Sequence, residues 1–345
     1  APKLRAGVVW VNATNLFDAA AGFGGVRESG FGREGGWEGL HAYLRPAAKT
    51  TVLKPVLALP APQEPVVEGM DRTAKLFIGG KQARPDGGYS KPVYGPKGAL
   101  LGHVGLGNRK DIRNAVEAAH AAKGWARTTG HNRAQILFYI AENLSARASE
   151  FAARLTAQTG KDGSAEVDAA ISRLFVYAAW ADKYDGAVKS VPIRGVALAM
   201  NEPCGVIGAL CPDEVPLLGL ISVMAPAIAM GNTCVLVPSE PFPLSATDVY
   251  QVLETSDLPA GVVNIVTGSH TELAKTIASH MDVDAVWSFS SSPVSHIIEA
   301  EAASNLKRTW VNNGRARDWM APDAEGRSFL RQATEVKTVW VPYGE

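Results

Sequence analysis

The sequence predicts an α/β protein with a Rossmann-like open parallel sheet, helices on both faces of the sheet, and an extended strand or flap at the end of the chain. The first observation behind this prediction is an alternation of short β-rich runs with helical stretches in residues 205–302. The second is a series of amphipathic helical stretches in residues 109–186. The third is a final β-rich segment that no helix follows.

The first 46 residues are rich in glycine and contain one predicted strand, AGVVWVNA. They also contain GFGREG (residues 30–35), which matches the G-x-G-x-x-G pattern of dinucleotide-binding loops. This match neither follows directly on a strand nor has an acidic residue at the required distance on a second strand. We therefore interpret it as a packed loop.

A domain boundary is predicted next. Residues 55–72 contain four prolines and no helical periodicity, which is typical of an extended connector. A predicted hairpin, KLFIGGKQARPDGG, follows it. Helical periodicity then covers residues 109–125, 131–161 and 164–186, and Gly160 is the predicted stop of the second stretch.

The second half of the chain predicts the parallel sheet. Its strands are expected in GVIGALCP, NTCVLVPS, GVVNIVTG and VDAVWSFS, with helices between them. After the last of these strands comes SSSPVSHIIEA, a turn and helix in the position of a phosphate-binding loop but without glycine. The final segment, TEVKTVWVPYGE, predicts one more strand.

The charge balance bears on possible partners. The 345 residues contain 34 Lys plus Arg and 34 Asp plus Glu, so no net field favours nucleic acid or an anionic membrane. No apolar run has the length of a membrane span, and the first residues lack the features of a signal peptide. We expect a cytoplasmic protein without nucleic-acid or membrane partners.

The three cysteines, Cys204, Cys211 and Cys234, show no CxxC spacing and no histidine at ligand spacing. We interpret them as buried small hydrophobic residues and predict no metal site. A nucleophilic role would need a neighbouring base and an exposed position, and the sequence around them provides neither.

Ordered motifs resemble the aldehyde dehydrogenase superfamily over nearly the whole chain. They are LFIGGKQ, DIRNAVEAAHAAKGW, QTGK, NEPCGVIGALCP, GNTCVLVPSE, LPAGVVNIVTG and LKRTWVNNG. Residues 1–46 resemble a different part of the same family, the end of its catalytic domain. The chain thus looks like the C-terminal portion of a two-unit polypeptide of the family-16 type, in which the second unit is a degenerate copy.

The resemblance implies a site whose catalytic groups have been replaced. The family's nucleophilic cysteine follows an E-L-G-G-K motif, which here begins at Asn312, and no cysteine comes after it. Asn312 also stands where the family has its general base, and an amide cannot take a proton from water. Glu214 stands where the family's asparagine holds the oxyanion, and Asp213 precedes it. We therefore predict no catalytic residue.

The implied cofactor site is also eroded. Val237 replaces a family lysine and Ser295 a family glycine, whereas Glu240 survives as the ribose-binding acid. Ser291 alone is in register as a phosphate ligand. Two interpretations remain open: Glu240 and Ser291 are vestigial, with no cofactor bound, or they belong to an altered nucleotide site.

Four regions follow from the resemblance. Residues 1–46 are the remnant of an upstream catalytic domain, 47–72 a linker, 73–330 the degenerate dinucleotide-binding domain, and 331–345 an oligomerisation strand whose free edges are expected to pair with another sheet. A second, looser copy of that strand is expected within residues 40–57. If both units carry such a strand, one polypeptide would imitate the family's dimer.

The leading functional hypothesis is a pseudoenzyme that stabilises, caps or oligomerises an active NAD-dependent aldehyde dehydrogenase unit of the same polypeptide. Its expected partners are that upstream unit and further copies in a homo-oligomer. A second hypothesis is a nucleotide-binding regulatory module that uses Glu240 and Ser291. A third is new acid–base chemistry at the adjacent carboxylates Asp213 and Glu214.

Overall fold

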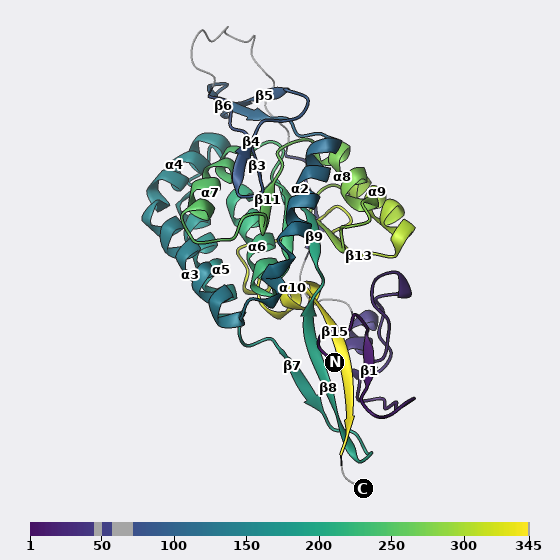
Figure 1. Ribbon diagram of the computed structural model, residues 1–345. Helices are drawn as coiled ribbons and strands as arrows, with labels where there is room; N and C mark the ends of the chain where they lie inside the picture. The colour runs from purple at the N-terminus through teal and green to yellow at the C-terminus, as the bar shows by residue number, and fades with distance from the viewer. Residues whose placement is uncertain (45–49, 57–71, 344–345) are drawn as a thin grey trace.

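The computed structural model describes residues 1–44, 50–56 and 72–343. Its centre is a seven-stranded sheet with the strand order β13-β12-β9-β10-β11-β3-β4 (Figure 1). The strands are β9 (Val206–Leu210), β10 (Thr233–Val237), β11 (Val263–Ile265), β12 (Ala285–Ser288), β13 (Arg308–Val311), β3 (Leu76–Ile78) and β4 (Lys81–Ala83). The first five are mutually parallel, and the predicted hairpin β3–β4 joins β11 in the antiparallel sense. The predicted parallel sheet is therefore confirmed.

Helices cover both faces of this sheet, as predicted (Figure 1). One face packs against α2 (Arg109–Ala121), α8 (His270–Ser279) and α9 (Ser292–Ala302). The other packs against α3 (Gly130–Ala146), α4 (Ala148–Thr159), α5 (Ser164–Trp180), α6 (Pro216–Ala229) and α7 (Leu244–Glu254). Strands β9, β10 and β12 are buried along their whole length, which explains why their sequences are continuous apolar runs and do not alternate.

The helix boundaries differ from the predictions in three places. The first predicted stretch, 109–125, ends as α2 at Ala121 and is followed by a 3-10 turn (Lys123–Arg127). The stretch 131–161 is two helices, because the chain leaves helical geometry at Arg147, between α3 and α4. Gly160 ends α4 as predicted, with a φ of 73° that favours glycine. The third stretch ends at Trp180, and Gly186 begins a strand, β7 (Gly186–Lys189).

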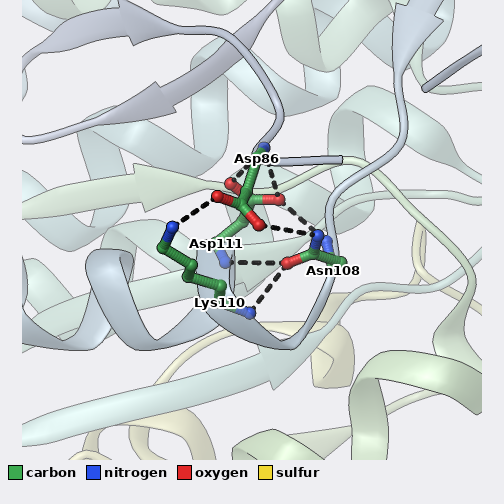
Figure 2. Close-up of polar contacts among 4 residues, drawn as sticks. All are labelled: Asp86, Asn108, Lys110 and Asp111. Carbon is green, nitrogen blue, oxygen red and sulfur yellow. Dashed lines mark hydrogen bonds and ion pairs between the residues drawn. The ribbon is translucent and has the colours of Figure 1, made fainter. Parts of the chain in front are cut away.

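The N-terminus of α2 shows how local sequence fixes a helix start (Figure 2). Asn108 accepts hydrogen bonds from the backbone N–H groups of Lys110 and Asp111, and Asp111 accepts one from the N–H of Asn108. Asp111 also accepts from the N–H of Asp86, so this capping box ties α2 to the loop before β5 (Ser90–Tyr94).

Replacing Asn108 with alanine is expected to lower the free energy of unfolding by about 1 kcal/mol, because two N–H groups lose their acceptor. Urea denaturation followed by circular dichroism measures this change. Lys110→Ala is the control, since its ion pair with Asp86 lies on the surface. Equal stability of N108A and the wild-type protein would contradict the role assigned to the cap.

A second sheet extends away from the Rossmann core (Figure 1). Its strand order is β1 (Val8–Trp10), β15 (Thr334–Pro342), β8 (Gly195–Pro203), β7. The final strand β15 is antiparallel to β8 along its entire length and parallel to β1. The expectation of free edges on the final strand is thus wrong in part: β8 occupies one edge along its whole length, and β1 occupies the other edge at Thr338–Trp340.

Three elements link the ends of the chain to the core. The strand β2 (Thr50–Val52) lies within the predicted second docking segment and pairs antiparallel with β14 (Arg315–Arg317). The short helix α10 (Arg327–Gln332) leads into β15, and α1 (Gly36–Leu40) lies in the first segment.

Part of the predicted linker, residues 47–49 and 57–71, lies outside the described residues. The remaining hairpin consists of β5 and β6 (Leu100–Gly105). Within the described ranges, no helix is long and apolar enough to cross a membrane.

Candidate functional site

Glu240, the predicted ribose-binding acid, is engaged by the protein itself. Its Oε2 accepts a hydrogen bond of 2.9 Å from the backbone N–H of His270, at the N-terminus of α8. Its own N–H donates to Asp213, and its carbonyl oxygen accepts from Lys91 Nζ. A carboxylate at a helix N-terminus is favourably placed with respect to the helix dipole. This arrangement gives Glu240 a structural role that needs no nucleotide.

Ser291 lies where the sequence places it, as the N-cap of α9, but its side chain makes no capping hydrogen bond. Its carbonyl oxygen accepts from the N–H and hydroxyl of Ser295. Pro293 removes one N–H from the first turn of α9. Gly314 closes over this turn, and a methyl group on it would lie 3.2 Å from the backbone nitrogen of Ser292. Ser291 and Pro293 are themselves exposed, so the first turn of α9 differs from a glycine-rich phosphate loop in its side chains and in the missing N–H of Pro293.

A buried network occupies the adjoining loop. The Nε2 of His270 donates to the carbonyl oxygen of Pro238, and its Nδ1 pairs with the hydroxyl of Ser290 at 2.9 Å. Both His270 and Ser290 are buried. The loops after β10 and β12, between which a dinucleotide would lie in a Rossmann fold, are thus joined by side chains of the protein.

Asn312 lies at the end of β13 and takes part in the same closure. Its N–H donates to the carbonyl oxygen of Ser288, and its side-chain oxygen accepts from Ser295 and from the N–H of Gly314. The amide thus shapes the turn over α9.

Glu214, at the position that the resemblance assigns to the oxyanion donor, is bonded to an indole. Its Oε1 accepts a 3.0 Å hydrogen bond from Trp319 Nε1, and its Oε2 is buried without a hydrogen-bond partner in the described part of the chain. Burial raises the pKa of Glu214, and the charge of Asp213 adds to the effect. Asp213 itself bonds to the N–H of Glu240. The two carboxylates thus have separate hydrogen-bond partners.

Glu214→Gln tests this environment through pH. A carboxyl whose pKa is higher in the folded state than in the unfolded state lowers the stability of the fold as the pH rises above the unfolded pKa. At such pH values the unfolded chain releases the proton more readily than the folded chain does. We expect E214Q to be more stable than wild type near pH 7.5 and the difference to vanish below the unfolded pKa of about 4.3. Thermal melts at both pH values measure it, and a difference independent of pH would contradict the assignment.

The cysteines do not form a reactive site. Cys211 and Cys234 are buried as predicted, whereas Cys204 is partly exposed as a residue, which corrects the expectation for it. Burial of the thiol still raises the pKa of Cys204 to about 12, and burial raises the pKa of the other two thiols further. Among the described residues, no group of three or more His, Cys, Asp or Glu side chains is arranged to hold a metal ion.

The sheet order and the loops at its carboxyl edge are those of a dinucleotide-binding type of α/β fold. The profile of the aldehyde dehydrogenase family matches residues 1–48 and 67–325, and the chain belongs to this family. The gap in the match falls within the predicted linker. The final strand β15 lies beyond the matched residues.

Several relatives show the same similarity. The chain is 33% identical over 304 residues to the mitochondrial aldehyde dehydrogenase of Sus scrofa, covering 84% of this chain and 57% of that protein. It is 34% identical to an aldehyde dehydrogenase of Agaricus bisporus, covering 69% and 50%. A betaine aldehyde dehydrogenase from Staphylococcus aureus, solved with NAD+, superposes with a TM-score of 0.66 at 26% identity, over 69% of this chain and 49% of that one. The chain spans about half the length of these relatives.

Sequence reasoning missed Arg173, which lies in α5 and holds the segment that contains Trp319. Arg173, in α5, is buried and donates to the carbonyl oxygens of Trp319 and Ala324 and to Ser222 Oγ. Its Nε forms an ion pair of 2.8 Å with Glu325. The sequence signal that could have identified Arg173 is a single arginine on the apolar face of a predicted helix.

Proposed function

We propose that this chain is the non-catalytic, aldehyde-dehydrogenase-like portion of a larger polypeptide, and that it stabilises and caps an active NAD-dependent aldehyde dehydrogenase unit of that polypeptide. The observation that carries the proposal is the parallel pairing of β1 with β15. In this pairing, a strand from the segment resembling the end of a catalytic domain is added to the terminal strand of the second unit.

Polar contacts fasten the first segment to β15. Arg33 donates to the carbonyl oxygen of Val336 through Nε and Nη2. The hydroxyl of Thr338 donates to the carbonyl oxygen of Gly22 at 2.6 Å, and both groups lie in the buried part of the junction. These contacts support a role for the second unit in holding the end of the upstream unit.

Exposed apolar side chains in the first segment support an upstream partner. Large apolar side chains remain exposed on it: Phe17 is 57% exposed, Trp37 66% and Tyr43 87%. Within the described residues, β1 pairs only with β15, so its other edge carries unpaired backbone groups. An upstream catalytic domain would cover both the aromatic side chains and the strand edge.

The closure of the nucleotide site supports the non-catalytic part of the proposal. Glu240 caps α8, Gly314 packs on the first turn of α9, and Glu214 stands at the position of the oxyanion donor. The relatives that have been solved with NAD+ give the cofactor expected for the upstream unit.

Trp340→Ala in the parent polypeptide tests the proposal. Trp340 packs in the junction with Ala21 and Ala197, and under this proposal the second unit contributes none of the catalytic residues. We expect the variant's NAD-dependent aldehyde oxidation to be lost at lower temperature than in the wild type. Tyr343→Ala, at an exposed aromatic residue just beyond β15, is the control. Identical thermal inactivation of W340A and wild type would contradict the stabilising role.

The regulatory hypothesis makes a different prediction for the same polypeptide. An altered nucleotide site at Glu240 and Ser291 would give saturable binding of an adenine nucleotide by this chain alone, together with a nucleotide-dependent activity of the upstream unit.

A further inference from the structure

Four aromatic rings surround one guanidinium group beside the closed site. The Cζ of Arg317 lies 5.7 Å from the ring centre of Phe289, 5.6 Å from Trp310, 5.4 Å from Trp319 and 5.2 Å from Phe329. Each distance is within the range in which a cation is attracted by the face of an aromatic ring. We call these four rings the aromatic box.

The four rings contact one another directly, apart from their contacts with Arg317. The rings of Phe289 and Trp310 meet edge to face at 5.1 Å, those of Phe289 and Trp319 at 5.0 Å, and those of Trp310 and Phe329 at 4.9 Å. Trp319 is fixed further by its bond to Glu214. Such mutual contacts hold the ring orientations whether or not a cation is present.

The guanidinium group of Arg317 has no side-chain hydrogen bond or ion pair among those described for the chain. The Nη1 of Arg317 is buried without a hydrogen-bond partner in the described residues. Burial lowers the pKa of this guanidinium, and the attraction of Asp323 only partly opposes that effect. Arg317 lies on β14, whose partner strand β2 is three residues long and exposed throughout. The side chain can therefore leave the box without breaking a side-chain hydrogen bond or ion pair described for it.

We propose that the aromatic box is a binding site for weakly hydrated organic cations, of the alkylguanidinium or quaternary ammonium class, which Arg317 occupies as an internal ligand. The box selects such cations because its walls are ring faces, which attract weakly hydrated cations. No carboxylate of the described residues forms an ion pair with the guanidinium: Glu214 bonds to the indole N–H of Trp319, and Asp323 attracts Arg317 without such a pair. This inference goes beyond the proposed function, since it concerns neither NAD nor the junction with an upstream unit.

Arg317→Ala is the direct test. With the internal ligand removed, we expect methylguanidinium and tetramethylammonium to raise the melting temperature and to change the tryptophan fluorescence saturably at millimolar concentrations. Wild-type protein should bind them about tenfold more weakly or worse, because Arg317 competes. Arg315→Ala, two residues away on the same strand with an exposed side chain, is the matched control and should behave as wild type. Ammonium chloride at equal ionic strength controls for salt.

Absence of a saturable response in folded R317A, or an equal response in R315A, would overturn the proposal. Arg317→Gln provides a second variant of similar side-chain length if the alanine variant does not fold. Arginine side-chain NMR of the wild-type protein supplies an independent measurement. Ring currents should shift the Arg317 Nε–H proton upfield, and tetramethylammonium should reverse the shift; a proton at its ordinary frequency would also overturn the proposal.

Discussion

Trp340→Ala in the isolated chain is expected to lower the free energy of unfolding by about 3–5 kcal/mol, the usual cost of truncating a buried tryptophan. Trp340 is 3% exposed and packs with Ala21 of the first segment and Ala197 of β8. It is also the β15 partner of Trp10 in the register of β1. Loss of this side chain should therefore detach the first segment and weaken the second sheet, β1-β15-β8-β7.

Limited proteolysis and urea denaturation measure the two consequences. In W340A, residues 1–44 should be cleaved at denaturant concentrations that leave the Rossmann core intact. Trp37→Ala is the control, because that side chain belongs to the same segment but is 66% exposed; we expect a change below about 0.5 kcal/mol. Equal protection of the first segment in W340A and wild type would show that β15 does not hold it.

Arg173→Ala is the second substitution with a large expected effect. Its loss leaves the carbonyl oxygens of Trp319 and Ala324 without these donors and leaves the Glu325 carboxylate unpaired. Breaking a buried charge pair typically costs about 3–5 kcal/mol, and the partial exposure of Glu325 places the expected loss at the lower end.

Hydrogen exchange and a control variant distinguish the local effect of R173A from a general loss of packing. The segment containing residues 319–325 should show faster hydrogen exchange in R173A than β10 does, because Arg173 holds that segment over Glu214. Arg147→Ala removes an arginine whose ion pair with Glu150 is on the surface, and it should cost less than about 1 kcal/mol. Uniform acceleration of exchange across the chain in R173A would contradict this local role.

The core of the fold could be predicted because its signals are local. Continuous apolar runs at β9, β10 and β12 and helical periodicity between them specify a parallel sheet with two covered faces. Gly160 marked a helix end because a positive φ favours glycine. Arg147, by contrast, is a good helix former, so its position at the break between α3 and α4 could not be predicted from its own propensity.

The contacts around the candidate site join residues far apart in the sequence. The resemblance assigns Glu214 to the position of the oxyanion donor, but the bond from Trp319 to Glu214 joins residues 105 positions apart. The bond from Glu240 to the N–H of His270 likewise depends on how two loops meet. Hydrophobic alternation predicted the final strand. It could not show that β8 pairs with one edge and β1 with part of the other, because strand pairing depends on the tertiary structure.

The most direct test of the central claim, that this chain keeps the fold while its own residues close the nucleotide site, is calorimetric titration of the purified chain with NAD+ up to millimolar ligand. The betaine aldehyde dehydrogenase of Staphylococcus aureus, solved with NAD+, serves as the positive control. We predict no saturable heat for this chain. Binding at micromolar NAD+, abolished by Glu240→Gln, would contradict the claim and favour the nucleotide-binding regulatory function.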